Sequence, residues 1–294
     1  MSKVYRRRRW NDDDPRFVLP SPDNNGDADT TPPDLDEGLP PGARWANWAD
    51  ADARGPLPQP DWLVTDGDAV DHDRGVIKTG KEADVFLVER WTPTGQTCLL
   101  AAKRYRDHHH RLFHRDSAYL DGRRVRRSRE MRAIANRTEI GRAIIAGQWA
   151  VAEHRALARL WQLGVPVPYP VQLDGTDLTL EFIGSADGTA APRLAQLRPD
   201  PATLTSLWVD LWASLVTLAE AGYVHGDLSA YNLLVHDDRV WLIDLPQIVD
   251  LIGNDNGPTF LRRDVANVSA WFAARGLVHD VDALVDELLD RARP

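Results

Sequence analysis

The sequence predicts an α+β fold of two lobes, with a small antiparallel sheet in the N-terminal lobe and a short, mainly helical C-terminal lobe. Three observations support this prediction. Short apolar runs separated by turns fill residues 76–105, as expected for strands. Longer segments in which apolar residues recur at helical spacing follow them. A last pair of short apolar runs, at 233–235 and 240–243, lies between Asp227 and Asn232 on one side and Asp244 on the other, which are side chains able to take part in catalysis.

The predicted N-terminal sheet begins with a strand–turn–strand unit over residues 76–88 and continues with a third strand over residues 98–105. The chain has four lysines among its 35 basic residues, and Lys78, Lys81 and Lys103 all lie in these strands or the turn between them. An ammonium binds a phosphate oxygen as a compact point charge, in a way that a planar guanidinium does not. Lys103 is therefore a candidate phosphate ligand, whereas an ordinary surface position explains Lys78 equally well.

Residues 146–161 are predicted to form an amphipathic helix. Trp149, Glu153, Ala156 and Leu160 share one face of it at spacings of i, i+4, i+7 and i+11. An acidic side chain on an inward, apolar face is costly unless it is paired. We therefore expect Glu153 to form an ion pair with Lys103, although a solvated glutamate on an exposed face is the simpler alternative.

A hairpin and a connecting segment follow the helix, over residues 171–184. In a two-lobed nucleotide enzyme this connection is the hinge, and the peptide groups of residues 181–183 are the expected contacts of a base. Residues 204–222 are predicted to form the central helix of the second lobe, and residues 281–289 have the spacing of an amphipathic packing helix.

The segment His225-Gly226-Asp227-Leu228-Ser229-Ala230-Tyr231-Asn232, followed by Leu242-Ile243-Asp244, has the composition of a phosphoryl-transfer site. Asp227 would orient a hydroxyl or water nucleophile, and Asn232 and Asp244 would hold the magnesium ion that bridges ATP phosphates. The predicted hairpin between them brings its two ends to one metal ion. The simpler alternative makes Asp227 a turn residue and Asn232 a cap.

Taken together, these motifs resemble the RIO kinases, specifically the branch with a Thr-Gly-Lys-Glu-Ala phosphate loop. The resemblance covers about Gly75 to about Gly276. It depends on Thr79-Gly80-Lys81-Glu82-Ala83, Ala102-Lys103, Glu181-Phe182-Ile183-Gly184, the segment 225–232, Ile243-Asp244-x-x-Gln247 and Leu261-Arg262-Arg263-Asp264-Val265-x-Asn267. It implies an atypical serine/threonine protein kinase with a bilobal kinase-like fold that uses ATP and Mg²⁺, or Mn²⁺ in its place.

The resemblance also implies roles for individual residues. Asp227 would be the catalytic aspartate, Lys103 the phosphate-binding lysine, and Asn232 and Asp244 the metal ligands. The aspartate at the position of Asp244 is also thought to accept phosphate transiently, which implies ATPase behaviour. The nucleotide would contact Lys81, Glu82, Ala83, Val85, Lys103, Glu153, Glu181, Phe182, Ile183, Ser229 and Tyr231.

Two further classes of function stay open. A small-molecule phosphotransferase of the aminoglycoside or choline type shares the loop around Asp227, but Ser229, Gln247 and the turn at residues 79–83 argue against it. Between Arg104 and Arg142, twelve arginines face five acidic residues in a protein of formal net charge −9. Such a basic segment could bind RNA, as in an ATP-gated, ribosome-associated assembly factor, or could simply be a solvated insertion.

The expected organisation has three parts: a disordered tail over residues 1–61, an N-terminal lobe over 62–183 with a basic insertion at 104–145, and a C-terminal lobe over 184–294. The single cysteine, Cys98, excludes an internal disulfide and suits a reducing cytoplasm. No uninterrupted apolar run approaches about 20 residues, so no membrane span is expected. The protein acceptor cannot be named from the sequence.

Overall fold

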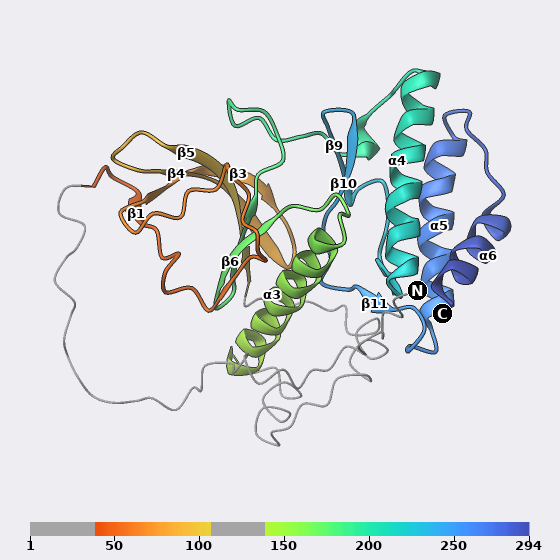
Figure 1. The fold of residues 1–294 in the computed structure, drawn as a ribbon, viewed down its shortest axis with the longest axis horizontal. Coiled ribbons are helices and arrows are strands. Elements are labelled where there is room, and N and C mark those ends of the chain that lie inside the picture. The colour runs from red at the N-terminus through yellow and green to blue at the C-terminus, as the bar shows by residue number, and fades with distance from the viewer. Residues whose placement is uncertain (1–38, 107–138, 294) are drawn as a thin grey trace, which may run out of the picture. The chain divides into compact units, whose positions relative to one another are not determined.

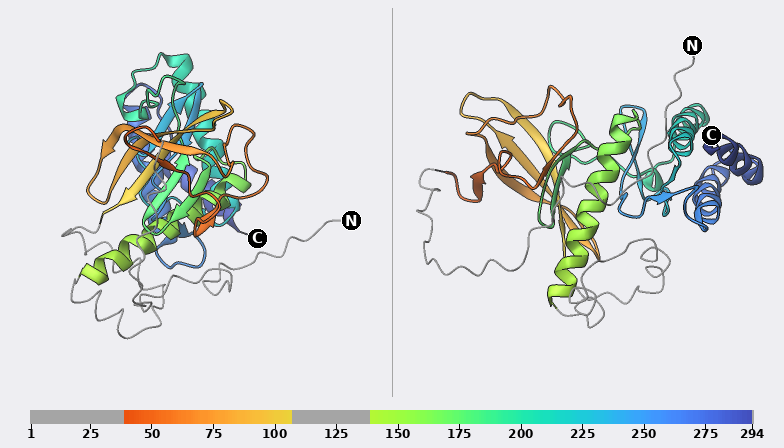
Figure 2. Two further views of the ribbon diagram at one scale, coloured as in Figure 1. Left: turned by 90° about the vertical axis from the view of Figure 1, so that its left-hand side faces the viewer. Right: turned by 60° about the horizontal axis from the view of Figure 1, so that its bottom comes forward.

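The computed structural model describes residues 39–106 and 139–293, together with the side chains of all of these except 139–145. The predicted α+β fold of two lobes is confirmed (Figure 1). A curled sheet forms one lobe, the helices α4, α5 and α6 lie in the other, and α3 crosses beside the sheet (Figures 1 and 2). The predicted tail up to residue 38 and most of the basic insertion lie outside the described residues.

The sheet of the N-terminal lobe has seven strands, and all neighbours pair antiparallel. Its centre is the predicted meander, in which one strand leads directly into the next. In spatial order the strands are β1 (Ala43–Trp45), β3 (Val70–Thr79), β4 (Ala83–Trp91), β5 (Thr97–Tyr105), β7 (Asp177–Glu181), β6 (Pro170–Asp174) and β2 (Ala53–Arg54).

The expected disordered tail was wrong for residues 39–61. β1 pairs with one edge of the sheet and β2 with the other, so this segment covers both edges. Trp48 is buried in the hydrophobic core of the lobe together with Val88 and Leu100. Pairing and burial of this kind stabilise short strands that have no apolar periodicity of their own.

Helix α3 (Glu139–Gln162) contacts β5, β6 and β7 and contains the predicted helix. It begins seven residues before the predicted start, within the segment expected as the end of the basic insertion. The helix terminates before Gly164, whose φ of +78° is readily adopted only by glycine. Glu153, Ala156 and Leu160 are buried, which confirms the predicted inward face.

The C-terminal lobe contains the short 3₁₀ helix η1 (Leu194–Gln196), three helices and two small two-stranded sheets. The predicted hairpin at 233–243 is present as β9 and β10. The elements are α4 (Pro201–Glu220), β8 (Tyr223–Val224), β9 (Leu233–His236), β10 (Arg239–Leu242), β11 (Val249–Asp250), α5 (Gly257–Ala273) and α6 (Val281–Ala292).

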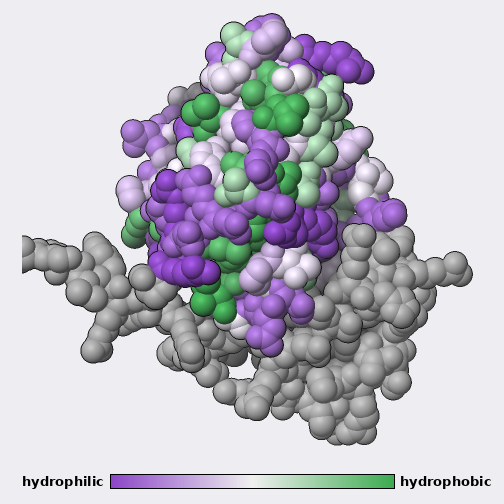
Figure 3. All heavy atoms as spheres, turned by 90° about the vertical axis from the view of Figure 1, so that its right-hand side faces the viewer, coloured by the Kyte–Doolittle hydropathy of each residue, from purple (hydrophilic) through white to green (hydrophobic). Residues whose placement is uncertain are grey.

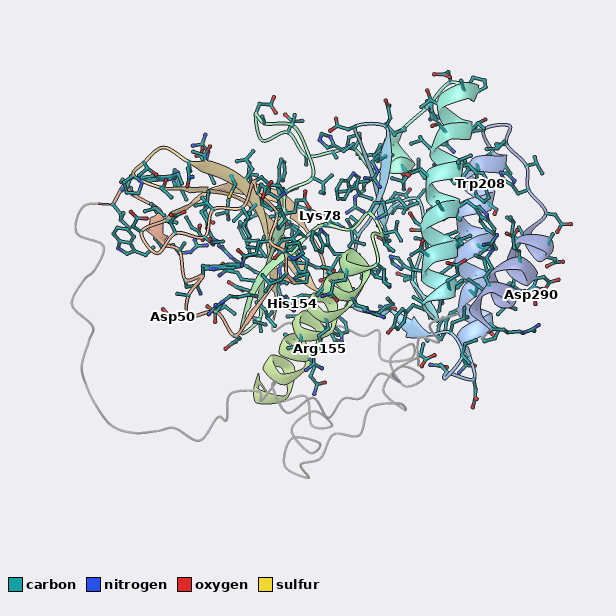
Figure 4. The ribbon with its side chains drawn as sticks, viewed as in Figure 1. Asp50, Lys78, His154, Arg155, Trp208 and Asp290 are labelled. Atoms are coloured by element: carbon teal, nitrogen blue, oxygen red, sulfur yellow. The ribbon has the colours of Figure 1, made fainter. Side chains whose placement is uncertain are left out.

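Helix α6 is the predicted amphipathic packing helix. Val285 and Leu288 are buried, and the helix packs on α4 and α5, while Asp290, labelled in Figure 4, lies on its outer side. Hydrophilic side chains with smaller hydrophobic groups between them cover this face of the molecule (Figure 3). Helix α4 alone among the described helices is long and apolar enough to cross a membrane, but its buried residues pack within the lobe, so this is weak support for a span.

Arg90 forms a buried ion pair that joins the beginning of β3 to β4 and β6. Its Nε lies 2.6 Å from Asp71 Oδ1 and its Nη2 lies 3.0 Å from Gln172 Oε1.

We expect Asp71→Ala to lower the free energy of unfolding by roughly 3–5 kcal/mol, because Arg90 is left buried without its carboxylate partner. Urea unfolding measures this. The control Asp68→Ala, at an exposed position, is expected to stay within about 0.5 kcal/mol; equal effects of both changes would contradict the prediction.

Candidate active site

A cavity of about 610 Å³ is lined by residues from both lobes. One part of its lining comes from β3, β4, β5 and the turn between β3 and β4, and another part from the segment after β7, from β9 and from Asp244. Ten of the residues predicted for a nucleotide site line it. These are Lys81, Glu82, Ala83, Val85, Lys103, Glu153, Glu181, Phe182, Ile183 and Asp244.

Lys103 is the centre of the polar contacts in this cavity. Its Nζ lies 2.7 Å from Glu153 Oε2 and 3.0 Å from Asp244 Oδ1, so the predicted ion pair is present and a second carboxylate joins it. Burial by itself lowers the pKa of Lys103, but the charges of Glu153 and Asp244 outweigh it and hold that pKa well above its usual value. In turn, the Lys103 ammonium lowers the pKa of Asp244. Lys103 and Asp244 are therefore both ionised near neutral pH.

The sequence did not predict that Tyr105 and Leu245 also bind Glu153. The Tyr105 hydroxyl donates a hydrogen bond to Glu153 Oε2, and the Leu245 N–H donates to Glu153 Oε1 at 3.2 Å. Burial, followed by the negative charge of Glu153, raises the pKa of Tyr105 well above its usual value, so the hydroxyl remains a donor. Tyr105 follows Lys103 by two residues in β5, and that same-face spacing was the available signal.

Asp264 of α5 holds the loop around Asp227 in place through hydrogen bonds to its backbone. Asp264 is buried, and its carboxylate accepts hydrogen bonds from the N–H groups of Gly226, at 2.7 Å, and Leu228, at 2.9 Å. These two N–H groups flank Asp227 in the chain. Asn267 completes the support by donating to the Leu228 carbonyl at 3.1 Å. The backbone on both sides of Asp227 is thereby fixed, which sets the direction of its side chain.

Hydrogen bonds connect this loop to Asp244. Asn232 Nδ2 donates to the Asp227 carbonyl at 2.9 Å, and the Ile243 N–H donates to the Asn232 carbonyl at 3.0 Å. Asp244 itself has a φ of +67°, an uncommon conformation for a non-glycine residue and one that often occurs at functional sites. The predicted hairpin therefore brings the two candidate metal ligands to one region.

The residues around Asn232 and Asp244 fit a magnesium ion. The amide nitrogen of Asn232 is used by Asp227 and one Asp244 oxygen by Lys103, which leaves one oxygen on each side chain without a partner in the described part of the chain. Mg²⁺ is usually held by one or two protein oxygens together with waters and substrate phosphates. The described residues contain no group of three or more acidic, histidine or cysteine side chains that could hold a metal ion by themselves.

Four predicted site residues do not line the cavity: Asp227, Ser229, Tyr231 and Asn232. Asp227 and Asn232 are tied to the segment that ends at Asp244. For Ser229 and Tyr231 the structure gives no support as nucleotide contacts. Tyr231 is 64% exposed, and Ser229 Oγ accepts a local hydrogen bond from the Tyr231 N–H.

At the hinge, Ile183 retains an unpaired backbone donor. Among the described residues its N–H has no hydrogen-bond partner, although its carbonyl accepts from the Ala191 N–H at 2.9 Å. The N–H of Glu181, by contrast, is bound to the Tyr169 carbonyl at 2.8 Å, and the Glu181 carboxylate accepts from the Tyr169 N–H. The N–H of Ile183, which lines the cavity, thus has no competing acceptor among the described residues, and the same holds for the N–H of Phe182.

A curled antiparallel sheet over a helical lobe, with a paired lysine, a glutamate on the crossing helix and an aspartate at the cleft, defines the class of protein-kinase-like folds. The model of the RIO domain matches residues 93–284, and the chain belongs to this family. That match begins after the turn at 79–83, so the predicted phosphate-loop branch stays a prediction.

Two curated relatives are similar over most of this chain. A RIO-type serine/threonine-protein kinase Rio1 from Haloferax volcanii is 35% identical over 226 residues, which are 76% of this chain and 71% of that protein. Serine/threonine-protein kinase RIO1 from Caenorhabditis elegans is 33% identical over 74% of this chain, but the match spans only 40% of that longer protein.

Among solved structures, the Rio2 kinase from Chaetomium thermophilum in an ADP/Mg²⁺-phosphoaspartate complex aligns with a TM-score of 0.56. The sequences are 22% identical, and the alignment covers 74% of this chain and 62% of that one. At this identity the match supports the fold, and it agrees with the two-lobed architecture described above.

The hydrogen bond from Tyr105 to Glu153 can be tested by removing one oxygen atom. We expect Tyr105→Phe to lower the free energy of unfolding by roughly 1.5–3 kcal/mol, because a buried carboxylate loses a donor. Tyr231→Phe removes the same atom at an exposed position and is expected to change stability by less than about 0.5 kcal/mol. Chemical unfolding of both variants measures the difference, and a Tyr105→Phe protein as stable as the control would show that the bond contributes nothing.

Proposed function

We propose that this protein is an ATP- and Mg²⁺-dependent serine/threonine protein kinase of the RIO type. The observation that carries the proposal is the cluster of Lys103, Glu153 and Asp244, in which one ammonium lies within 3.0 Å of two carboxylates from different parts of the chain. The free N–H of Ile183 in the same cavity supports a bound purine. The kinase names of the two relatives support the choice of reaction.

In the proposed mechanism the protein positions its substrates and supplies compensating charge. Glu153 holds Lys103 in the orientation from which its ammonium contacts the phosphates of ATP. Asn232 and Asp244 would hold Mg²⁺, which when bound neutralises charge on those phosphates. Asp227 accepts the proton of the acceptor hydroxyl as that oxygen attacks the terminal phosphorus atom, and the bond from this phosphorus to the bridging oxygen breaks with release of ADP.

The proposal favours a protein acceptor over an aminoglycoside or choline, since the family to which the chain belongs includes named protein kinases. We place the activity in the cytoplasm, on the strength of a single buried cysteine and no disulfide framework. An RNA or ribosome contact through the arginine-rich segment stays a prediction, because most of that segment lies outside the described residues.

The role of Asp227 gives a direct test. We expect Asp227→Asn to lower phosphate transfer by roughly 10²- to 10⁴-fold, because the base is removed while the backbone contacts of the loop remain. Transfer is measured with radiolabelled ATP, as autophosphorylation or on a general protein acceptor, and ATP binding is measured by calorimetry. Asp238→Asn, the same change in the exposed turn between β9 and β10, serves as the control. Transfer at the control's rate in the Asp227 variant would contradict the assignment.

A second test concerns a phosphoenzyme on Asp244, as part of the same proposal. A carboxylate oxygen of Asp244 would attack the terminal phosphorus, the bond to the bridging oxygen would break with release of ADP, and water would later hydrolyse the acyl phosphate. We expect labelled enzyme to lose its phosphate in hydroxylamine, and Asp244→Asn to form no hydroxylamine-labile species. A label that resists hydroxylamine in the wild type would exclude this route and leave direct transfer.

A further inference from the structure

Lys78 lies in the same row of the sheet as Lys103. Lys78 of β3 pairs with Val85 of β4, and Val85 pairs with Lys103 of β5. Residues directly opposite each other on antiparallel strands project from the same face. Their Cα atoms are therefore two strand spacings, or about 10 Å, apart. All three residues line the cavity, and Lys78 lies between the sheet and the C-terminal lobe (Figure 4).

The backbone of β3 directs Lys78 into the cavity. The pairing of β3 with β4 shifts register between Val76 and Lys78, which marks a β-bulge. In a regular strand Ile77 and Lys78 would point to opposite faces, yet both line the cavity. A bulge re-aims a side chain in this way, and bulges are frequent beside active sites. The position of Lys78 is thus set by the strand itself.

Arg193 contributes a cation from the other part of the lining of the same cavity. It follows the hinge and precedes η1. Its Nη1 donates to the Tyr231 carbonyl at 2.6 Å, and its backbone N–H donates to Gln196 Oε1 at 2.8 Å. The first contact anchors the guanidinium to the loop that contains Asp227, and the second fixes the backbone of Arg193 at the start of η1.

No ion pair joins Lys78 or Arg193 to a carboxylate in the part of the chain that the structure describes, whereas Lys103 has two. Partial burial, followed by the charge of Arg193, lowers the pKa of Lys78 against the opposite effects of Asp244 and Glu82, so the two cations lie close enough to interact. Two cations that share a cavity and have no salt bridge repel each other, and an anion bound between them relieves that repulsion. The chemistry of this part of the cavity is therefore that of an anion site.

We propose that Lys78 and Arg193 form a cationic clamp, one cation from each lobe, that binds the phosphate chain of a nucleotide. This inference rests on the proposed function. A nucleotide is favoured over an acidic segment of a protein acceptor because Lys78 shares its row with Lys103, with Val85 between them. A ligand that reaches from the Ile183 N–H to Asp244 therefore passes beneath this row.

The test compares the affinities of ATP, ADP and adenosine by calorimetry, for the full chain and for Lys78→Gln and Arg193→Gln. We expect each variant to lose about five- to tenfold in ATP affinity, a modest value because both groups are partly solvated, and to bind adenosine within twofold of wild type. Arg193→Lys keeps the charge and should retain most of the ATP affinity. Arg198→Gln removes one positive charge at an exposed position that does not line the cavity, and serves as the control.

The outcomes separate the clamp from the proposed function. If wild type binds ATP and both variants bind it equally well, the clamp is refuted while the proposed function stands. If ATP affinity is unchanged but the KM for a protein acceptor rises, the site belongs to an acidic segment of the acceptor and the clamp is again refuted. Equal losses for ATP and adenosine would indicate a structural effect. If wild type binds no nucleotide, the proposed function fails first.

Discussion

The arrangement of this active site depends on the carboxylate of Glu153. The side chain is almost completely buried, at 1% exposure for the residue, and a buried charge is tolerated only when it is paired and hydrogen-bonded. Its partners are Lys103 and Tyr105 from β5 and the N–H of Leu245, which follows Asp244. One carboxylate from α3 therefore joins the sheet of the first lobe to the segment of the second that contains the candidate metal ligand Asp244. A shift of α3 would move both.

Asp264 has the corresponding role within the C-terminal lobe. Burial raises the pKa of Asp264, and the hydrogen bonds from the N–H groups of Leu228 and Gly226 have the opposite, smaller effect. The geometry matters more than this balance, because the two N–H groups enclose Asp227. The cleft thus has two buried carboxylates that perform no chemistry in the proposed reaction. Glu153 positions Lys103, and Asp264 positions the backbone on both sides of the candidate base Asp227.

A feature of this structure could be predicted where the residues that form it have a recognisable pattern in the sequence. The Lys103–Glu153 pair was predictable because an acid on an apolar helix face needs a cation, and lysine is rare in this chain. Residues 39–61 were missed because β1 and β2 have three and two residues and depend on the sheet edges they cover. The bond from Tyr105 was missed because a tyrosine in a strand reads as ordinary core. Tyr231 belongs to a motif, but its side chain points to solvent, which no spacing reveals.

The charge of the cleft differs from that of the whole protein. The formal net charge is −9, whereas the charged residues that line the cavity balance, with Lys78, Lys81, Lys103 and Arg193 beside Glu82, Glu153, Glu181 and Asp244. A polyphosphate is therefore repelled by the protein as a whole and less so at the cleft, where low-dielectric walls strengthen the effect of each nearby cation. Lys103 is already neutralised by Glu153 and Asp244, so the attraction must come from the cations that lack such partners among the described residues. In the proposed function Lys103 orients the phosphates. Lys78 and Arg193, which have no ion pair among the described residues, supply the additional attraction that holds them.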